Sequence, residues 1–190
     1  MQIARSFGTC SYPADCLFLA AMNPCKCGYY PDRNRCRCTQ SEIHRYLSRV
    51  SGPILDRIDI CVEAPRVDVE ELSLRKEPCG ETSAQIRERV LKARQMQKKR
   101  FAGTKLRFNA DMNPSQLRKY CPLGEAQERL LNSLFHSLQL SARSYHRIIR
   151  VARTIADLDG SEQIEKKHLT EAACYRMADM RYWADREGDS

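Results

Sequence analysis

The chain has 190 residues, which is enough for one domain or two small ones. Hydrophobic residues make up 42% and charged residues 29%, as in a soluble globular protein, and no apolar run approaches the roughly 20 residues that span a bilayer. The ten cysteines occur without a visible secretory signal, which favours reduced, partly metal-bound thiols in the cytoplasm over a disulfide scaffold. The net charge of +8 favours anionic partners such as nucleic acid or phosphates.

The N-terminal part reads as the end of an α/β unit. Residues 2–5 predict a short strand, and the turn residues after them predict a hairpin that leads into a buried strand at Leu17–Met22. Because the chain begins inside a sheet, we expect a larger N-terminal part to be missing. Asn23 follows the strand directly, and a polar residue at the tip of an apolar strand is a common place for chemistry in α/β proteins.

A cysteine loop with the spacing C-x-C-x8-C-x-C comes next. Its thiols belong to Cys25, Cys27, Cys36 and Cys38, and the loop between the two pairs holds turn-forming residues. Zinc favours four thiolates in a tetrahedron, and each pair of cysteines can supply one edge. Two cysteines separated by one residue bind the same metal ion with more strain than two separated by two residues. Four reduced cysteines in an ordinary loop therefore remain the alternative.

Two more elements are predicted before the chain changes character. Residues 39–42 form a capping box that starts a helix over 40–50. Apolar and polar residues alternate in Ile58–Glu63, which predicts a second strand. A short acidic helix or turn is expected over 68–74, and the proline and glycine in 75–82 indicate a linker.

After the linker the pattern is helical throughout. Capping residues, apolar periodicity and a closing Asp-Gly predict five helices, over 82–101, 114–120, 124–137, 142–158 and 167–183. The tail, 184–190, is expected to fray. The predicted fold is therefore an α/β fragment with an incomplete sheet over 1–74, followed by an all-α domain over 83–183.

Three polar residues are candidates for phosphate chemistry, and each alone is a weak signal. Asn23 could orient a water or phosphate oxygen, although an asparagine before proline also forms turns. Arg57 could reach a phosphate across a subunit boundary, or pair with Asp56 or Asp59 on the surface. Arg143 lies in the first turn of a helix, where a cation is unfavourable unless an anion binds it, although the cost of an exposed arginine there is small.

The excess positive charge is local. Nine lysines and arginines, but one acidic residue, lie between Ser83 and Arg107. Such a helix is suited to line a nucleic-acid channel, with a solvated face as the alternative. The candidate nucleic-acid-binding residues are Arg87, Lys92, Arg94, Lys98, Lys99 and Arg100.

Four blocks of sequence resemble one family in its own order. AAMNPCKCGYY, CRC, YLSRVSGPILDRIDICVE and LSARSYHRIIRVARTIADLDG are similar to the magnesium-chelatase-like AAA+ ATPases of the YifB/ComM type. The resemblance covers nearly the whole chain but only the C-terminal part of such a protein. The family's N-terminal domain and its Walker A and Walker B motifs have no counterpart in this sequence.

The resemblance implies roles that spacing alone does not. Asn23 matches sensor 1, which positions the attacking water and the γ-phosphate; Arg57 matches the arginine finger that acts on the neighbouring subunit's nucleotide; Arg143 matches sensor 2. Residues 1–74 correspond to the end of the AAA+ core and 83–183 to the helical lid domain. Family members are implied to be hexameric rings that use ATP with Mg²⁺, some acting on DNA, and many carry the cysteine loop.

Three functional hypotheses remain open at this point. The chain is a sensor and lid portion of a ring ATPase, a stand-alone zinc-containing nucleic-acid-binding module, or a truncated remnant without function. Because the phosphate loop and the Mg²⁺-binding carboxylates are absent from this sequence, we predict that the chain alone does not hydrolyse ATP.

Overall fold

The computed structural model describes residues 2–13, 16–64 and 80–183, the last seven of these by their backbone only. The chain divides into two compact units, Met1–Leu47 and Ser48–Ser190, and each has its own architecture. Within the described ranges, none of the helices is both long and apolar enough to cross a membrane.

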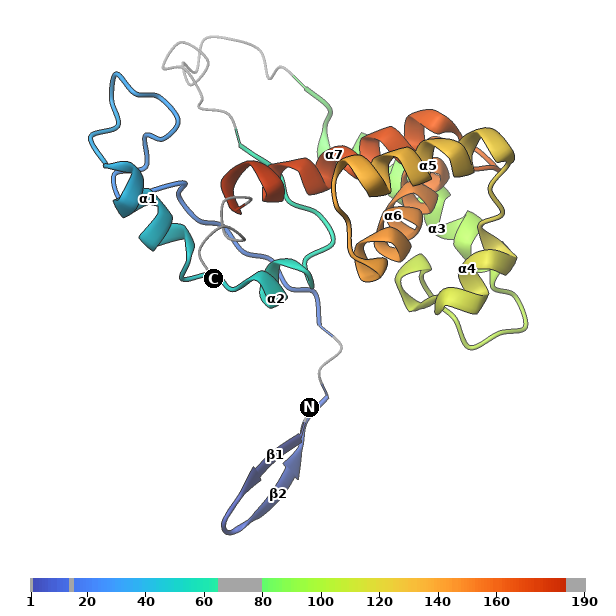
Figure 1. Cartoon of the computed structure of the whole chain (residues 1–190). Coiled ribbons are helices and arrows are strands. Elements are labelled where there is room, and N and C mark those ends of the chain that lie inside the picture. Colours follow the sequence, from blue (N-terminus) through green and yellow to red (C-terminus); the bar gives the residue numbers. More distant parts are fainter. Residues whose placement is uncertain (1, 14–15, 65–79, 184–190) are drawn as a thin grey trace. The chain divides into compact units, whose positions relative to one another are not determined.

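The first unit contains a hairpin, a long irregular stretch and one helix. Strands β1 (Gln2–Arg5) and β2 (Gly8–Ser11) pair antiparallel with Gln2 opposite Ser11, as the sequence predicts (Figure 1). Helix α1 (Gln40–Leu47) begins at the predicted capping box and buries Ile43 and Leu47. It ends three residues before the predicted end at residue 50.

The predicted strand at Leu17–Met22 is wrong for this chain. These residues form no regular structure, and Leu17 and Leu19 are 94% and 90% exposed. A strand needs neighbours that satisfy its backbone groups and cover its apolar side chains. The only sheet among the described residues is the β1–β2 hairpin, and it does not supply them.

The second unit is helical. It begins with the short helix α2 (Gly52–Leu55), and the predicted strand Ile58–Glu63 that follows is again an irregular segment, with Ile60 and Val62 exposed. The later helices are α3 (Ser83–Arg100), η1 (Asn109–Asp111), α4 (Pro114–Tyr120), α5 (Glu125–Ser137), α6 (Ala142–Leu158) and α7 (Lys166–Trp183). The predicted all-α part is therefore confirmed in its helices, whereas the described part of the predicted α/β fragment has a hairpin, helices α1 and α2, and irregular segments.

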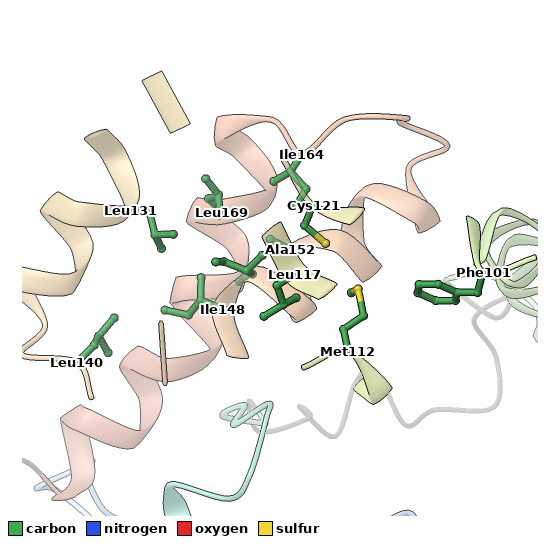
Figure 2. Close-up of a cluster of buried hydrophobic side chains, with 12 residues drawn as sticks. Phe101, Met112, Leu117, Cys121, Leu131, Leu140, Ile148, Ala152, Ile164 and Leu169 are labelled. Carbon is green, nitrogen blue, oxygen red and sulfur yellow. The ribbon is translucent and has the colours of Figure 1, made fainter. Parts of the chain in front are cut away.

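Helix α6 is the centre of this unit. It packs against α3, α4, α7 and η1, and α5 closes on α7. Figure 2 shows the apolar cluster between them, to which α6 contributes Ile148 and Ala152, α5 contributes Leu131 and α7 contributes Leu169. Ser141 caps α6 by accepting a hydrogen bond from the backbone N–H of Ser144, and the helix ends just before Gly160 at φ +70°.

A polar network is buried at the C-terminal end of α6. Asp157 is 1% exposed and accepts from Arg100, from Asn109 Nδ2 at 2.8 Å and from Arg153 Nε at 3.1 Å. Arg153 also donates to the carbonyl of Glu162 at 2.8 Å. A buried carboxylate needs this many donors, so the network ties α3, η1 and the chain after α6 together.

Candidate metal centre and nucleotide-site residues

The four loop cysteines come together as the sequence predicts. All four Sγ atoms lie within 4.8 Å of one another. Cys25 Sγ lies 3.3 Å from Cys27 Sγ and 3.8 Å from Cys36 Sγ, and the Cys27–Cys36 distance is 3.5 Å. Four thiolates at about 2.3 Å from a zinc ion would be about 3.8 Å apart, so the cluster fits a zinc ion held by Cys25, Cys27, Cys36 and Cys38.

Backbone turns of the loop bring the two cysteine pairs together. The N–H of Gly28 donates to the carbonyl of Cys25 at 3.1 Å, and Gly28 adopts φ +78°, which a residue with a side chain rarely does. The carbonyl of Asp32 accepts from Cys36 N at 2.7 Å, and its side chain accepts from Asn34 N at 3.0 Å. These turns are local, so the loop's geometry depends on few residues outside it.

The electrostatics of the thiols suit a cation. Burial alone would raise the pKa of Cys25, but the backbone of Tyr30 and the thiols of Cys27 and Cys36 donate to it and lower its pKa to about 6. Burial and the neighbouring Cys25 thiolate raise the pKa of Cys36 to about 12, although a backbone N–H of Cys38 opposes this. The first thiolate thus forms readily, and its charge opposes ionisation of a second thiol. A bound metal cation would offset this repulsion between thiolates.

Asn23 lies beside this loop. A Cβ atom added at Gly28 would lie 3.7 Å from Asn23 Cγ and Nδ2, so the asparagine side chain rests over the glycine. Asn23 is itself exposed. The candidate sensor and the cysteine loop are therefore neighbours within the first unit, and the loop limits where the Asn23 amide can lie.

Arg57 lies just after α2 and is exposed. Its guanidinium donates to the carbonyl of Pro53 at 2.8 Å, which holds it in the turn. Within the described part of the chain it forms an ion pair with neither Asp56 nor Asp59. The surface pairing that the sequence leaves open for Arg57 is therefore not what the structure contains.

Two buried arginines occupy those carboxylates instead. Arg147 of α6 places Nε 2.7 Å from Asp59 Oδ1, and Arg176 of α7 places a guanidinium nitrogen 3.6 Å from Asp56 Oδ1. Arg176 also donates to the carbonyls of Ile58 at 3.0 Å and Leu55 at 3.3 Å. Burial lowers the pKa of Arg147, and the charge of Asp59 opposes that shift.

Sequence reasoning missed both arginines. Arg147 lies on the side of α6 away from Ile149 and Ala152, which periodicity predicts to face solvent. The chain just after α2 covers that side, and no local sequence pattern predicts this long-range contact. The one available signal is the pair of aspartates around Arg57, whose charges need partners.

Arg143, the third candidate, is exposed in the first turn of α6, two residues after the Ser141 cap. It stands one turn before Arg147 on the same helix. The structure thus brings Asn23 to the cysteine loop and places Arg57 and Arg143 in the other unit, whose α6 carries Arg143 and contacts the Arg57 segment through Arg147.

The candidate nucleic-acid-binding residues of α3 fall into two groups. Arg100 is bound to Asp157, and Arg94 donates to Gln97 Oε1 at 3.1 Å and stacks 4.0 Å from the Phe108 ring. These two guanidiniums are engaged inside the protein. The others are exposed: Arg87, Lys92, which pairs with Glu88, Lys98 and Lys99.

Comparison with known proteins decides the family. The C-terminal profile of magnesium chelatase subunit ChlI matches residues 80–176, and the profile of magnesium chelatase subunit ChlI matches residues 1–72. The chain belongs to the magnesium chelatase ChlI-like family. The magnesium chelatase-like chain is also 42% identical over 174 residues to "Competence protein ComM" of Haemophilus influenzae, and 39% identical over 179 residues to "Uncharacterized protein YifB" of Escherichia coli.

These relatives are longer than the magnesium chelatase-like chain. The matches cover 92% and 94% of this chain but 33% and 34% of the two relatives. An uncharacterized protein of Mycobacterium tuberculosis shows the same relation at 34% identity, with 95% of this chain and 35% of the relative covered. The chain therefore spans about a third of the length of the curated relatives that it matches, and is homologous to their C-terminal region.

Proposed function

We propose that the chain is the sensor and lid portion of a ring-forming AAA+ ATPase of the YifB/ComM type. In the assembled ring, Asn23 orients the attacking water, Arg143 contacts the phosphates of the same nucleotide, and Arg57 reaches the nucleotide of the neighbouring subunit. Mg²⁺ and ATP are held mainly by the phosphate loop and carboxylates that longer relatives are expected to supply.

The state of Arg57 carries this proposal. An exposed arginine flanked by two aspartates would ordinarily pair with one of them. Within the described residues, both carboxylates are instead bound by arginines of α6 and α7, and Arg57 contacts a backbone carbonyl. Its charge is thus available to an external anion, which is what an arginine finger needs.

The exposed apolar segments support an incomplete site. Leu17, Leu19, Ile60 and Val62 stand in solvent although their sequence is that of buried strands. Exposed apolar segments of this kind are candidate interaction surfaces. We propose that they join a sheet formed by the part of the longer relatives that this chain does not match.

A chimera tests the proposal. This chain replaces the matching third of the Haemophilus influenzae relative, and steady-state ATP hydrolysis is measured. We expect the chimera to hydrolyse ATP and an Arg57→Ala variant to lose about a thousandfold in kcat, because an arginine finger stabilises transition-state charge. Arg129→Ala, which removes an exposed arginine on α5, is the matched control. Undiminished turnover in the Arg57→Ala chimera contradicts the proposal.

Mixed rings test whether the finger acts between subunits. Arg57→Ala chimeras are combined with chimeras whose phosphate-loop lysine is changed, each inactive alone. A finger donated across the interface restores activity in the mixture, whereas a finger acting within its own subunit does not. DNA added to the active chimera is expected to change the rate of hydrolysis, which tests the coupling to DNA remodelling.

The cysteine cluster favours a second candidate, a zinc-containing nucleic-acid-binding module. Its contact surface would be the exposed side of α3, with Arg87, Lys98 and Lys99. This reading requires the chain alone to bind nucleic acid with a steep dependence on salt. A filter-binding titration that finds no affinity at low salt rejects it, while leaving the ATPase proposal intact.

A further inference from the structure

The turn that carries Arg57 is held mainly by side chains of α6 and α7. Arg176 reaches the carbonyls of Leu55 and Ile58 and the carboxylate of Asp56. Arg147 reaches Asp59 and, at 3.4 Å, the same carbonyl of Ile58. The carbonyl of Leu55 also accepts from the backbone N–H of Ile58 at 3.0 Å, and a planar guanidinium can donate to two carbonyls at once.

Both arginines are buried where α6 and α7 meet the turn. Arg147 is 8% exposed and Arg176 is 6% exposed, and Arg176 lies 3.5 Å from the buried Ser144 hydroxyl. One backbone bond adds to them, from Cys61 N–H to the carbonyl of Tyr175 at 3.1 Å. We call Arg147 and Arg176 together the clamp. It binds the turn through ion pairs of Arg147 with Asp59 and of Arg176 with Asp56.

We propose that the clamp positions Arg57 and couples it to α6. Because the clamp binds both flanking carboxylates, the guanidinium of Arg57 forms an ion pair with neither and contacts the carbonyl of Pro53. Because Arg143 stands one turn before Arg147 on α6, a movement of α6 on contact with phosphate carries the clamp with it. The inference rests on the proposed function: it links the nucleotide sensed by Arg143 to the arginine presented to the next subunit.

Arg147 and Arg176 are positioning residues in this account, since they act through Arg57. Lysine in place of Arg176 keeps the charge but cannot bridge two carbonyls and a carboxylate in one plane. The turn should then open more often while α6 and α7 remain packed. Arg153 gives a matched control, because it is a buried arginine of the same helix that binds Asp157 and not the turn.

Hydrogen exchange on the intact chain tests the clamp without any ATPase. Backbone amides of residues 54–61 should exchange about tenfold faster in Arg176→Lys and in Arg147→Lys. Arg153→Lys should lower the melting temperature without a selective effect on those amides. Unchanged exchange in both clamp variants, in protein whose helical circular dichroism is intact, overturns the clamp.

The chimera with the Haemophilus influenzae relative tests the coupling. Arg176→Lys should lower kcat about tenfold and leave the KM for ATP unchanged, because the finger acts on the transition state rather than on binding. Arg153→Lys should leave kcat per folded ring unchanged. Normal kcat in Arg176→Lys with faster exchange overturns the coupling alone. If Arg57→Ala is also fully active, the proposed function fails while the clamp, measured by exchange, stands.

Discussion

Residues 142–158 and residues 17–22 both carry apolar side chains that the sequence predicts to be buried, yet those of the first are buried and those of the second are exposed. In α6, Ile148 and Ala152 are at most 1% exposed because α3, α4, α7 and η1 pack against this helix and α5 adds Leu131 to the same apolar cluster. In the first unit, Leu17 and Leu19 meet no such surface. Apolar sequence is thus necessary for burial, but the facing surface decides it, and none of the described residues covers Leu17 or Leu19.

The helical unit and the cysteine loop also differ in how they are stabilised. The helical unit holds itself by an apolar cluster and a buried ionic network, both spread over many elements. The cysteine loop has a few local turns and four thiols. A substitution in the apolar cluster or ionic network should therefore destabilise the whole helical unit, whereas a substitution in the cysteine loop should have a local effect.

The largest effect is expected from the buried network. Asp157→Ala leaves Arg100 and Arg153 without their carboxylate, and we expect about 3–5 kcal/mol loss in the free energy of unfolding. Urea unfolding followed by circular dichroism measures it. Glu125→Ala, at an exposed position of α5, should change stability by less than about 0.5 kcal/mol. Equal stability of the two variants would show that the network is not what holds the helical unit.

Loss of a cysteine ligand should be local. Wild-type protein purified under reducing conditions should contain about one zinc ion per chain, and Cys36→Ser should lose it. Amides of residues 24–38 should then exchange faster, while the unfolding of the helical unit is unchanged. Cys174→Ser, an exposed cysteine on α7, should keep the metal. Full zinc content in Cys36→Ser contradicts the assignment.

Zinc affinity should fall as the pH falls, since thiolates bind zinc and protons compete for them. With its pKa at about 6, Cys25 is ionised at neutral pH, whereas Cys36, at about 12, must release its proton on binding. Cys38 also has a raised pKa, so at least two protons leave and the apparent affinity should drop about a hundredfold per pH unit. Competition with a chromophoric chelator at two pH values measures the slope. An affinity independent of pH excludes thiolate ligands.

The smallest effect is expected in the exposed segment. Leu19→Ser removes no buried contact and should change the stability of the chain by less than about 0.5 kcal/mol. The corresponding change in the core, Leu131→Ser, should cost about 3 kcal/mol or more. In the chimera Leu19→Ser should instead destabilise, because the sheet proposed for the longer relative would cover this side chain. A large loss in the chain alone would contradict the exposure of residues 17–22.

Local signals in the sequence were sufficient for the helices and the thiol cluster. The Ser141 cap and Gly160 bound α6 where predicted, and the Thr82–Gln85 capping box starts α3, because caps act through hydrogen bonds to residues three or four positions away. The cysteine cluster follows in the same way from turns at Gly28 and Asp32. Such features need nothing from distant parts of the chain.

Tertiary structure alone decided the strands and the arginines. The alternation in Ile58–Glu63 is a strand pattern, but a strand forms only beside another strand, and in the sheet that the structure describes β1 pairs only with β2. Arg147 and Arg176 read as surface charges until the turn carrying Arg57 covers them. The sequence by itself therefore determined the helices, their caps and the thiol spacing, whereas long-range contacts decided which apolar segments are buried and which carboxylates remain for Arg57.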